Sequence, residues 1–319
     1  MQIDIPKRDP TLQRAKRYPE YKAIYLKLPE YIQAILGVHG LKQKKAILWR
    51  KGISSFVFKL KGKKDLALKI SPRYSLFTEI YFFKKARSRG FPVPKIIMAD
   101  ISQKLIPYHF HITEWISGNT PDEFRNRDLY SCAFELGRMF AKMHKIKTEG
   151  FGFPLPMGGW SHKSWSSALR DFIYRETSLK QIRSFFGERI ANLTIKIIKD
   201  KKMNIKSPSL IHGDTGEDQF VVEKNGEWVI RGILDPSDYI SGDPMVDIAG
   251  AMITWNKKTY RDGFYDGYAS VHKLDKNEVY RLNRLCFLNQ VWAASIVYQT
   301  NKIDGRAVAK KARLLAKKF

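Results

Sequence analysis

The sequence predicts an α+β protein in which a small, strand-rich part precedes a larger, mostly helical part. The chain has 319 residues, which suits one large domain or two lobes. Its content of 44% hydrophobic and 13% aromatic residues is ample for a buried core, which excludes a disordered or low-complexity chain. The apolar pattern changes from short alternating runs to helical spacing after Gly118, and this change separates the two parts.

The first part begins with residues 1–40, which we expect to form an N-terminal helical extension because apolar side chains follow helical spacing there. Residues 41–116 follow as a small lobe with an antiparallel sheet and one main helix. Its strands are expected at about 46–49, 56–60, 66–70, 95–101 and 109–115. The helix starts near Ser75 and ends at Gly90, where Pro92 and Pro94 follow as a stop signal.

The second part, residues 117–319, is predicted to be mainly helical. An apolar stripe from Leu129 to Met143 indicates one helix. Further helices are expected at about 164–200, 244–256, 276–300 and 305–316. A loop with two short strands interrupts them at 208–240.

The cysteines and the apolar runs exclude several classes of protein. Cys132 and Cys286 are too few for a disulfide scaffold or a four-cysteine zinc module. The longest uncharged run, 285–301, contains several amides and a serine, so no membrane partner is expected. Charged side chains occupy the N-terminus where a signal peptide needs an apolar stretch, so a cytoplasmic location is the expectation.

Charge is distributed unevenly along the chain. The formal net charge is +26, and residues 1–69 hold 17 basic and 5 acidic side chains. Residues 214–247 reverse this sign, with 9 acidic and 2 basic side chains. A local concentration of acid in a basic protein directs attention to the motifs of this segment.

The acidic segment begins with Leu-Ile-His-Gly-Asp-Thr-Gly-Glu-Asp-Gln at 210–219. A predicted strand at 229–234 leads into Asp235, and Gly-Asp-Pro-Met-Val-Asp follows at 242–247. This order resembles the aminoglycoside phosphotransferase family, which comprises small-molecule relatives of protein kinases and is related to hygromycin-type phosphotransferases and choline kinases. The family pattern is His-x-Asp, then Asn five residues after the Asp, then an Asp that ends the next strand. His212, Asp214 and Asp235 match, whereas Gln219 stands where the family has Asn.

The resemblance covers about residues 45–255 and implies a two-lobe protein-kinase-like fold that binds ATP or GTP between its lobes, with Mg²⁺. Phosphoryl transfer needs a carboxylate beside the acceptor hydroxyl and a second carboxylate for the metal. Asp214 suits the first role and Asp235 the second, and Gln219 offers the metal a carbonyl oxygen one methylene further out. Structural support of the site is expected from His212, Asp243, Asp247 and His144.

The small lobe supplies a second match. Strand alternation places Lys69 opposite the apolar face of its strand, and Glu79 lies on an apolar helical stripe where a carboxylate needs a partner. The two resemble the strand-Lys and helix-Glu pair of kinase-like folds, which holds the Lys against nucleotide phosphates. The resemblance further implies that Ser54 or Ser55 donates to phosphate, although an ordinary hairpin turn is the alternative there. It also implies that the backbone around Glu114 and Ile116 meets a purine edge.

The acceptor is expected to be a hydroxyl group of a small molecule. Only 12 positions separate Asp235 from Asp247, which leaves no room for the activation segment of a protein kinase. Glu217, Asp218 and Asp238 are candidates for binding a cationic acceptor such as an aminoglycoside, which would make the protein an antibiotic-resistance enzyme. The alternatives are that they only offset basic surroundings, and that the acceptor is a sugar, a choline-like alcohol or a hydroxyamino acid.

A second class of function stays open, a catalytically weak pseudoenzyme whose basic surface binds nucleic acid. Gln219 is the feature in its favour, whereas the presence of Lys69, Glu79, Asp214 and Asp235 argues against it. The basic side chains concerned are Lys42, Lys44, Lys45, Arg50, Lys51, Lys59, Lys61, Lys63 and Lys64, with Arg306, Lys310, Lys311, Arg313, Lys317 and Lys318 near the C-terminus. We expect these to be solvated faces that bind nucleic acid only non-specifically, and we expect a monomer or weak dimer.

Overall fold

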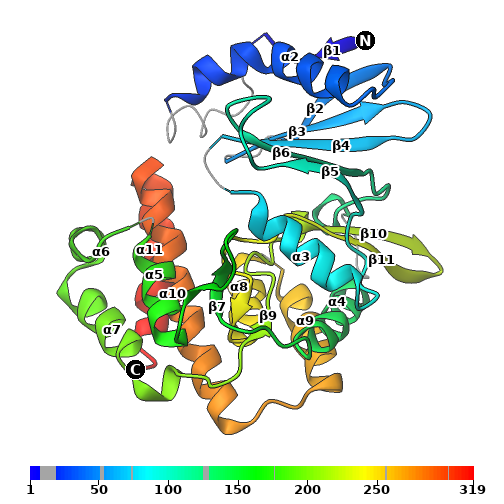
Figure 1. Ribbon diagram of the computed structural model, residues 1–319. Helices are drawn as coiled ribbons and strands as arrows, with labels where there is room; N and C mark the ends of the chain where they lie inside the picture. Colours follow the sequence, from blue (N-terminus) through cyan, green and yellow to red (C-terminus); the bar gives the residue numbers. More distant parts are fainter. Residues whose placement is uncertain are drawn as a thin grey trace. The chain divides into compact units, whose positions relative to one another are not determined.

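The computed structural model describes residues 1–7, 19–50, 54–72, 75–124, 129–175, 177–255, 257–300 and 302–319. They form two compact units, Met1–Ser117 and Gly118–Phe319 (Figure 1). Unit 1 is built on a β-sheet and unit 2 is mostly helical, which agrees with the predicted α+β class.

Unit 1 contains a six-stranded sheet in the order β1-β2-β3-β4-β6-β5. Its strands are β1 (Gln2–Asp4), β2 (Lys45–Arg50), β3 (Phe56–Lys61), β4 (Leu66–Ser71), β5 (Ile96–Asp100) and β6 (His109–Glu114). The five predicted strands are all present and pair antiparallel. The sixth, β1, was not predicted and pairs parallel with β2, because three residues are too short to show an alternating pattern.

One face of this sheet is buried against helix α2 (Tyr21–Val38). Leu28 and Ile32 of the helix share a hydrophobic core with Phe56, Phe58 and Leu68 of the sheet. The segment expected as a helical extension therefore supplies both β1 and a helix that covers the sheet. Because side chains alternate along a strand, Lys69 and its neighbours on the other face stay clear of this core.

Helix α3 (Phe77–Arg87) follows β4 and matches the helix predicted between Ser75 and Gly90. Glu79 lies in its first turn and is buried. A carboxylate in the first turn is stabilised by the positive end of the helix dipole. The short connection between β4 and α3 therefore delivers Glu79 to the strand that carries Lys69.

The helices of unit 2 are α4 (Leu129–Met143), α5 (Trp165–Tyr174), α6 (Leu179–Phe186), α7 (Glu188–Ile198), α8 (Met245–Thr254), α9 (Lys258–Val271), α10 (Lys276–Thr300) and α11 (Lys302–Ala316). The single helix predicted at about 164–200 is in fact three. Ser164 and Ser178 each cap a new helix, and Gly187 divides α6 from α7 with φ of 87°. Helix α9 lay outside the predicted helical ranges.

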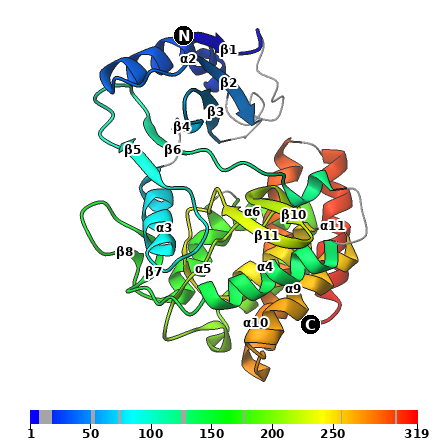
Figure 2. The ribbon, with the colours of Figure 1, turned by 90° about the vertical axis from the view of Figure 1, so that its right-hand side faces the viewer.

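Helices α4 and α9 pack along one another with main chains in close contact (Figure 2). A Cβ added to Gly137 of α4 would lie 2.0 Å from the Phe264 carbonyl oxygen. A Cβ on Gly267 of α9 would lie 2.0 Å from the Phe134 carbonyl oxygen, and one on Gly263 would lie 2.4 Å from that of Tyr130. Glycine is therefore required at three positions of this contact.

Short strands frame the motif segment. The strands of unit 2 are β7 (Phe151–Pro154), β8 (Trp160–His162), β9 (Ser209–Leu210), β10 (Phe220–Asn225), β11 (Glu227–Ile233) and β12 (Ser241–Gly242). The predicted strand at 229–234 corresponds to β11, which pairs antiparallel with β10. The pair β7–β8 was not predicted, and it joins β12 and β9 in a four-stranded sheet. The motif residues 211–219 thus lie between β9 and β10, and Asp235 lies just beyond β11.

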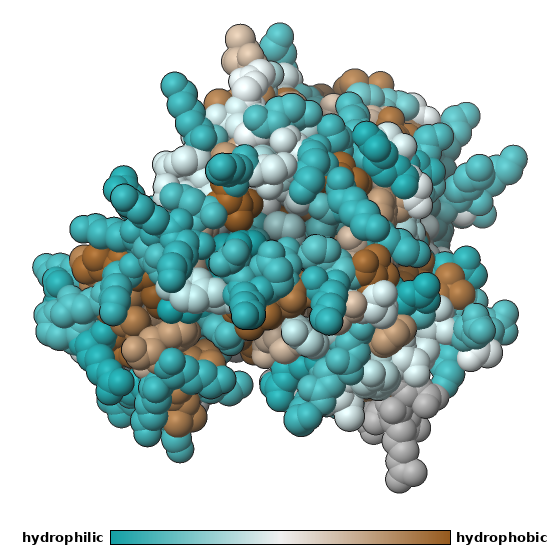
Figure 3. Space-filling view, turned by 90° about the horizontal axis from the view of Figure 1, so that it is seen from below, coloured by the Kyte–Doolittle hydropathy of each residue, from teal (hydrophilic) through white to brown (hydrophobic). Residues whose placement is uncertain are grey.

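One face of the molecule is largely hydrophilic. Hydrophilic residues cover most of the face shown in Figure 3, and apolar residues appear there in separate patches. Within the described part of the chain, none of the helices combines the length and apolar character needed to span a bilayer.

Candidate active site

Lys69 and Glu79 form a buried ion pair in unit 1. The Lys69 Nζ lies 2.6 Å from the Glu79 Oε2. Both residues are less than a tenth exposed. The pair that the sequence predicted is therefore present, and it joins strand β4 to helix α3.

His111 is a second partner of Glu79 that the sequence did not reveal. Its Nε2 lies 3.3 Å from the Glu79 Oε1, so the two carboxylate oxygens meet different side chains. His111 stands directly opposite Lys69 in the β4–β6 ladder. Two adjacent strands and a helix thus converge on one carboxylate.

The electrostatics of this cluster favour the ionised carboxylate. Burial acts to raise the pKa of Glu79, but Lys69 and His111 oppose it through their charges and hydrogen bonds and hold the pKa at about 2. Glu79 is therefore charged at neutral pH and fixes the position of Lys69.

The other predicted residues of unit 1 lie in well-defined surroundings. The Ser54 carbonyl oxygen accepts from the Tyr21 hydroxyl at 2.9 Å, and Ser55 is buried. Residues 51–53, which complete the predicted phosphate turn, lie outside the described residues. The Glu114 Oε1 accepts from Arg87 at 3.2 Å and from the Lys95 N–H at 3.1 Å, so its side chain braces α3 and the start of β5. Ile116 follows β6 and is half-buried.

The turn at His212–Asp214 in unit 2 is held by the buried carboxylate of Asp247. Asp247 accepts from the His212 N–H and the Gly213 N–H, each at 2.7 Å. His144 Nε2 lies 2.9 Å from the same carboxylate, and its Nδ1 lies 2.9 Å from the Tyr268 hydroxyl. The structural roles expected for Asp247 and His144 thus correspond to contacts that fix the turn.

His212 is buried and is part of the same backbone network. Its Nε2 lies 2.8 Å from the Leu234 carbonyl oxygen, and its Nδ1 lies 3.3 Å from the Asp214 N–H. This arrangement requires the neutral tautomer with the proton on Nε2. Burial lowers the pKa of His212, which agrees with that neutral state. His212 therefore ties the turn to the end of β11 and does not face an acceptor as a base.

Only glycine, which has no Cβ, fits this turn at position 213. Its φ is 76°, and an added Cβ would lie 2.0 Å from the Ser237 Oγ and 2.7 Å from the Tyr239 carbonyl oxygen. The positive φ and these close contacts exclude every larger residue from position 213.

Asp214 is an accessible carboxylate at the end of this turn. Its side chain keeps solvent access, yet the surrounding loop removes enough water that burial raises its pKa, and the charges of Asp235 and Asp218 raise it further, to about 7. The Asp214 Oδ1 also accepts from the Gly216 N–H at 3.3 Å. A carboxylate with a pKa near neutrality is suited to take up a proton from a hydroxyl group.

Asp235 and Gln219 are brought together by a backbone hydrogen bond from Leu234 to the Gln219 carbonyl oxygen at 2.8 Å. Asp235 has φ of 53°, a left-handed conformation that is uncommon for residues other than Gly and often marks functional sites. The Gln219 Nε2 donates to Asp218 at 3.1 Å. The Gln219 Oε1 is buried, and no group among the described residues donates to it.

The oxygen atoms of Asp235 and Gln219 are of the kind that fits Mg²⁺. A buried amide oxygen without a donor is costly unless a water molecule or a cation meets it. The described residues contain no cluster of three or more His, Cys, Asp or Glu side chains that could hold a metal. Mg²⁺ needs no such cage, because it is commonly bound by one or two protein oxygens together with phosphates and water.

Asp243 is fully buried and paired with Arg281, whose Nε lies 2.6 Å from the Asp243 Oδ2. Its Oδ1 accepts from the Met245 N–H at 3.1 Å, at the start of α8. Asp243 therefore links α8 to α10.

The three candidate acceptor-binding acids have different surroundings. Asp218 is exposed and lies close enough to Asp214 to raise its pKa. Glu217 is half-buried, and its charge acts on the pKa of Tyr260. The Asp238 Oδ2 lies 3.1 Å from the Arg175 Nη1. The sequence did not single out Arg175, because sequence alone does not distinguish an Arg that pairs with a distant carboxylate from an Arg that is exposed to solvent.

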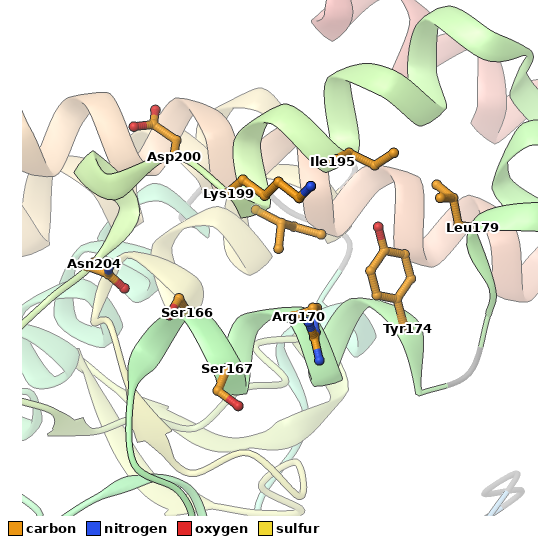
Figure 4. Close-up of a pocket in the computed structure, with 10 residues that line it drawn as sticks. Ser166, Ser167, Arg170, Tyr174, Leu179, Ile195, Lys199, Asp200 and Asn204 are labelled. Atoms are coloured by element: carbon orange, nitrogen blue, oxygen red, sulfur yellow. The ribbon is translucent and has the colours of Figure 1, made fainter.

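A cavity of about 580 Å³ lies against another side of helix α5 (Figure 4). Residues of α5, α6 and α7 and the following loop line it, among them Arg170, Tyr174, Leu179, Ile195, Lys199 and Asn204. Asp171 and Arg175, by contrast, contact Tyr239 and Asp238. The cavity and the motif loop therefore lie against different faces of α5.

Solved structures share this two-lobe, kinase-like architecture. A thermostable mutant of an aminoglycoside phosphotransferase, in ternary complex with AMP-PNP and hygromycin B, aligns with a TM-score of 0.71 at 14% identity, covering 91% of this chain and 98% of that one. A macrolide 2′-phosphotransferase type I aligns at 0.60, with 14% identity and coverage of 89% and 95%. A spectinomycin phosphotransferase, in complex with ADP and spectinomycin, aligns at 0.56, with 14% identity and coverage of 90% and 97%.

The fold is therefore that of the kinase-like phosphotransferases. The model of the phosphotransferase enzyme family matches residues 48–280, and the chain belongs to that family. The predicted class of enzyme, a phosphotransferase, and the resemblance from which it came are confirmed. None of the curated proteins matches the sequence.

Proposed function

We propose that the protein transfers the γ-phosphoryl group of ATP or GTP to a hydroxyl group of a small molecule, with Mg²⁺ as the metal. The observation that carries the proposal is Asp214, an accessible carboxylate with a pKa of about 7 on a turn fixed by Asp247 and His212. Such a carboxylate is poised to accept a proton at neutral pH. Family membership and similarity to structures that hold AMP-PNP or ADP support the use of a nucleotide.

In the proposed reaction, Asp214 orients the acceptor hydroxyl and takes up its proton. The hydroxyl oxygen forms a bond to the γ-phosphorus as the bond from phosphorus to the bridging oxygen of the nucleoside diphosphate breaks. Mg²⁺ held by Asp235 and Gln219 would neutralise phosphate charge and offset the Asp235 charge that raises the pKa of Asp214. Most of the protein's contribution is positioning, which is why the turn carries so many backbone hydrogen bonds.

The proposal assigns the nucleotide to residues of unit 1. Lys69, held by Glu79 and His111, supplies a cation for the α and β phosphates. Ser54 and Ser55 are proposed to donate to phosphate, and the backbone at Glu114 and Ile116 to meet the base. Ser54 and Ser55 come just before β3. Glu114 is the last residue of β6 and Ile116 follows it. These positions at the ends of two strands support the proposed roles.

The test is magnesium-dependent release of ADP or GDP with a panel of aminoglycosides, other antibiotics, sugars, amino alcohols and hydroxyamino acids. Asp214→Asn is the inactive variant, and Glu223→Gln is its matched control, because it removes an exposed carboxylate of the same unit that pairs with Arg231 in the β10–β11 hairpin, outside the proposed site. We expect one acceptor class to turn over, with the loss confined to Asp214→Asn. Equal turnover by wild type and Asp214→Asn would contradict the proposed base, and absence of nucleotide binding would favour a pseudoenzyme.

A further inference from the structure

The loop that follows Asp235 lies beside the turn that carries Asp214. The Ser237 N–H donates to the His212 carbonyl oxygen at 2.8 Å. The Tyr239 carbonyl oxygen lies so close to Gly213 that no Cβ fits there. A molecule whose hydroxyl reaches Asp214 therefore meets the side chains that this loop presents.

The carboxylate of this loop is already paired. The Asp238 Oδ2 lies 3.1 Å from the Arg175 Nη1. The Arg175 guanidinium also lies 5.6 Å from the centre of the Phe153 ring and 5.8 Å from that of Tyr239. Cation–π contacts of this kind restrain an Arg beyond what a half-exposed ion pair achieves alone. Arg175 thus screens Asp238 from an approaching cation.

A second carboxylate on this side, Asp171, is also engaged. It accepts from the Tyr239 hydroxyl and lies 3.3 Å from the His162 Nε2. Asp171 lies in α5, and Arg175 follows the last residue of that helix four positions later with helical backbone angles, so both face the same loop. A polycationic acceptor needs uncompensated negative charge, but on this side of the turn Asp238 is paired with Arg175, and Asp171 is engaged by Tyr239 and His162.

Aromatic rings make up the rest of this surface. His162 stacks on Tyr239 with ring centres 6.2 Å apart, and Phe153 and Phe172 meet it edge-on at 5.7 and 5.5 Å. We call Phe153, His162, Phe172 and Tyr239 the Tyr239 cluster. The first three are half-buried and keep part of their surface accessible. Partly accessible aromatic side chains favour contact with the apolar face of a ring-shaped ligand.

We infer that Arg175 determines acceptor specificity: it screens Asp238, so that the site takes a neutral, ring-shaped hydroxyl compound of the sugar or glycoside type and disfavours polyamines. The inference rests on the proposed phosphotransferase function and narrows its acceptor. The net charge of +26 acts in the same direction, because it repels cations at long range.

The test measures the binding of kanamycin, used as a polycationic probe, by calorimetry at low salt. Arg175→Met keeps an apolar stem but removes the charge, and Arg175→Lys keeps the charge. Arg170→Met is the matched control, because it removes the same charge from the same helix but from the face that lines the cavity of Figure 4. We expect Arg175→Met to bind kanamycin about fivefold more tightly than wild type, as for one exposed ion pair. We expect Arg170→Met and Arg175→Lys to stay within twofold of wild type.

Three results would overturn the inference: equal gains in Arg175→Met and Arg170→Met, an equal gain in Arg175→Lys, or an aminoglycoside as the best acceptor in the turnover panel. The last result would leave the phosphotransferase proposal intact. If the phosphotransferase proposal fails, no acceptor supports nucleotide turnover. The comparison of kanamycin binding among the variants does not depend on turnover, so the two failures can be told apart.

Discussion

Replacing Glu79 by Gln tests the buried cluster of unit 1. The cluster lowers the pKa of Glu79 from its usual 4.5 to about 2. Each pKa unit corresponds to about 1.4 kcal/mol, so the ionised carboxylate contributes about 3 kcal/mol to the stability of unit 1. Because the folded pKa is depressed, this contribution is complete above pH 4.5 and is lost as the pH falls toward 2. We therefore expect Glu79→Gln to lose about 3 kcal/mol at pH 7 and progressively less in acid.

The assay is urea unfolding of both proteins at pH 7, 5 and 3, with hydrogen exchange at pH 7 on peptides from β4 and α3 to assign the loss to unit 1. Glu114→Gln is the control, because it removes a carboxylate of the same unit that is 41% exposed and paired with Arg87. An exposed pair of this kind contributes less than about 1 kcal/mol. Equal losses for the two variants at pH 7, or a loss for Glu79→Gln that does not shrink between pH 5 and pH 3, would refute the reasoning.

Three further changes probe the site in unit 2. Gly213→Ala forces a Cβ against Ser237 and displaces the turn, so turnover should fall about 100-fold while nucleotide affinity, measured by calorimetry, is unchanged; normal turnover would show that the turn has room. Asp247→Asn removes one of the two carboxylate oxygens that accept backbone N–H groups and should cost about 1–3 kcal/mol in urea unfolding, together with turnover; wild-type stability would remove Asp247 as the brace. Gln219→Asn should preserve or raise turnover and lower the magnesium concentration required in a titration, whereas loss of activity would exclude residue 219 as a metal ligand.

The parts of the site that the sequence predicted are those in which one segment carries the whole pattern. Lys69 and Glu79 are ten residues apart on a strand and the helix that follows it, so local periodicity places both. The order of His212, Asp214 and Asp235 around one hairpin is likewise local. Such local patterns predict the structure well because they do not depend on how distant segments of the chain pair.

The parts that the sequence did not predict depend on pairing between distant segments. His111 reaches Glu79 only because β6 lies next to β4, and this register is not visible in either strand alone. Arg175 meets Asp238 across 63 positions of chain. No predicted helical range covered α9, because its glycines, such as Gly263 and Gly267, lower helix propensity, and their value appears only in the contact with α4.

The contact between α4 and α9 has a consequence for engineering this protein. The spacing of these helices is set by main-chain atoms, so changes in the size of nearby side chains leave it unaltered. His144, just after α4, and Tyr268 of α9 meet across that spacing and hold Asp247. A library that diversifies the surface of these helices but keeps Gly137, Gly263 and Gly267 can therefore vary side chains widely while the turn at residues 212–214 stays in register.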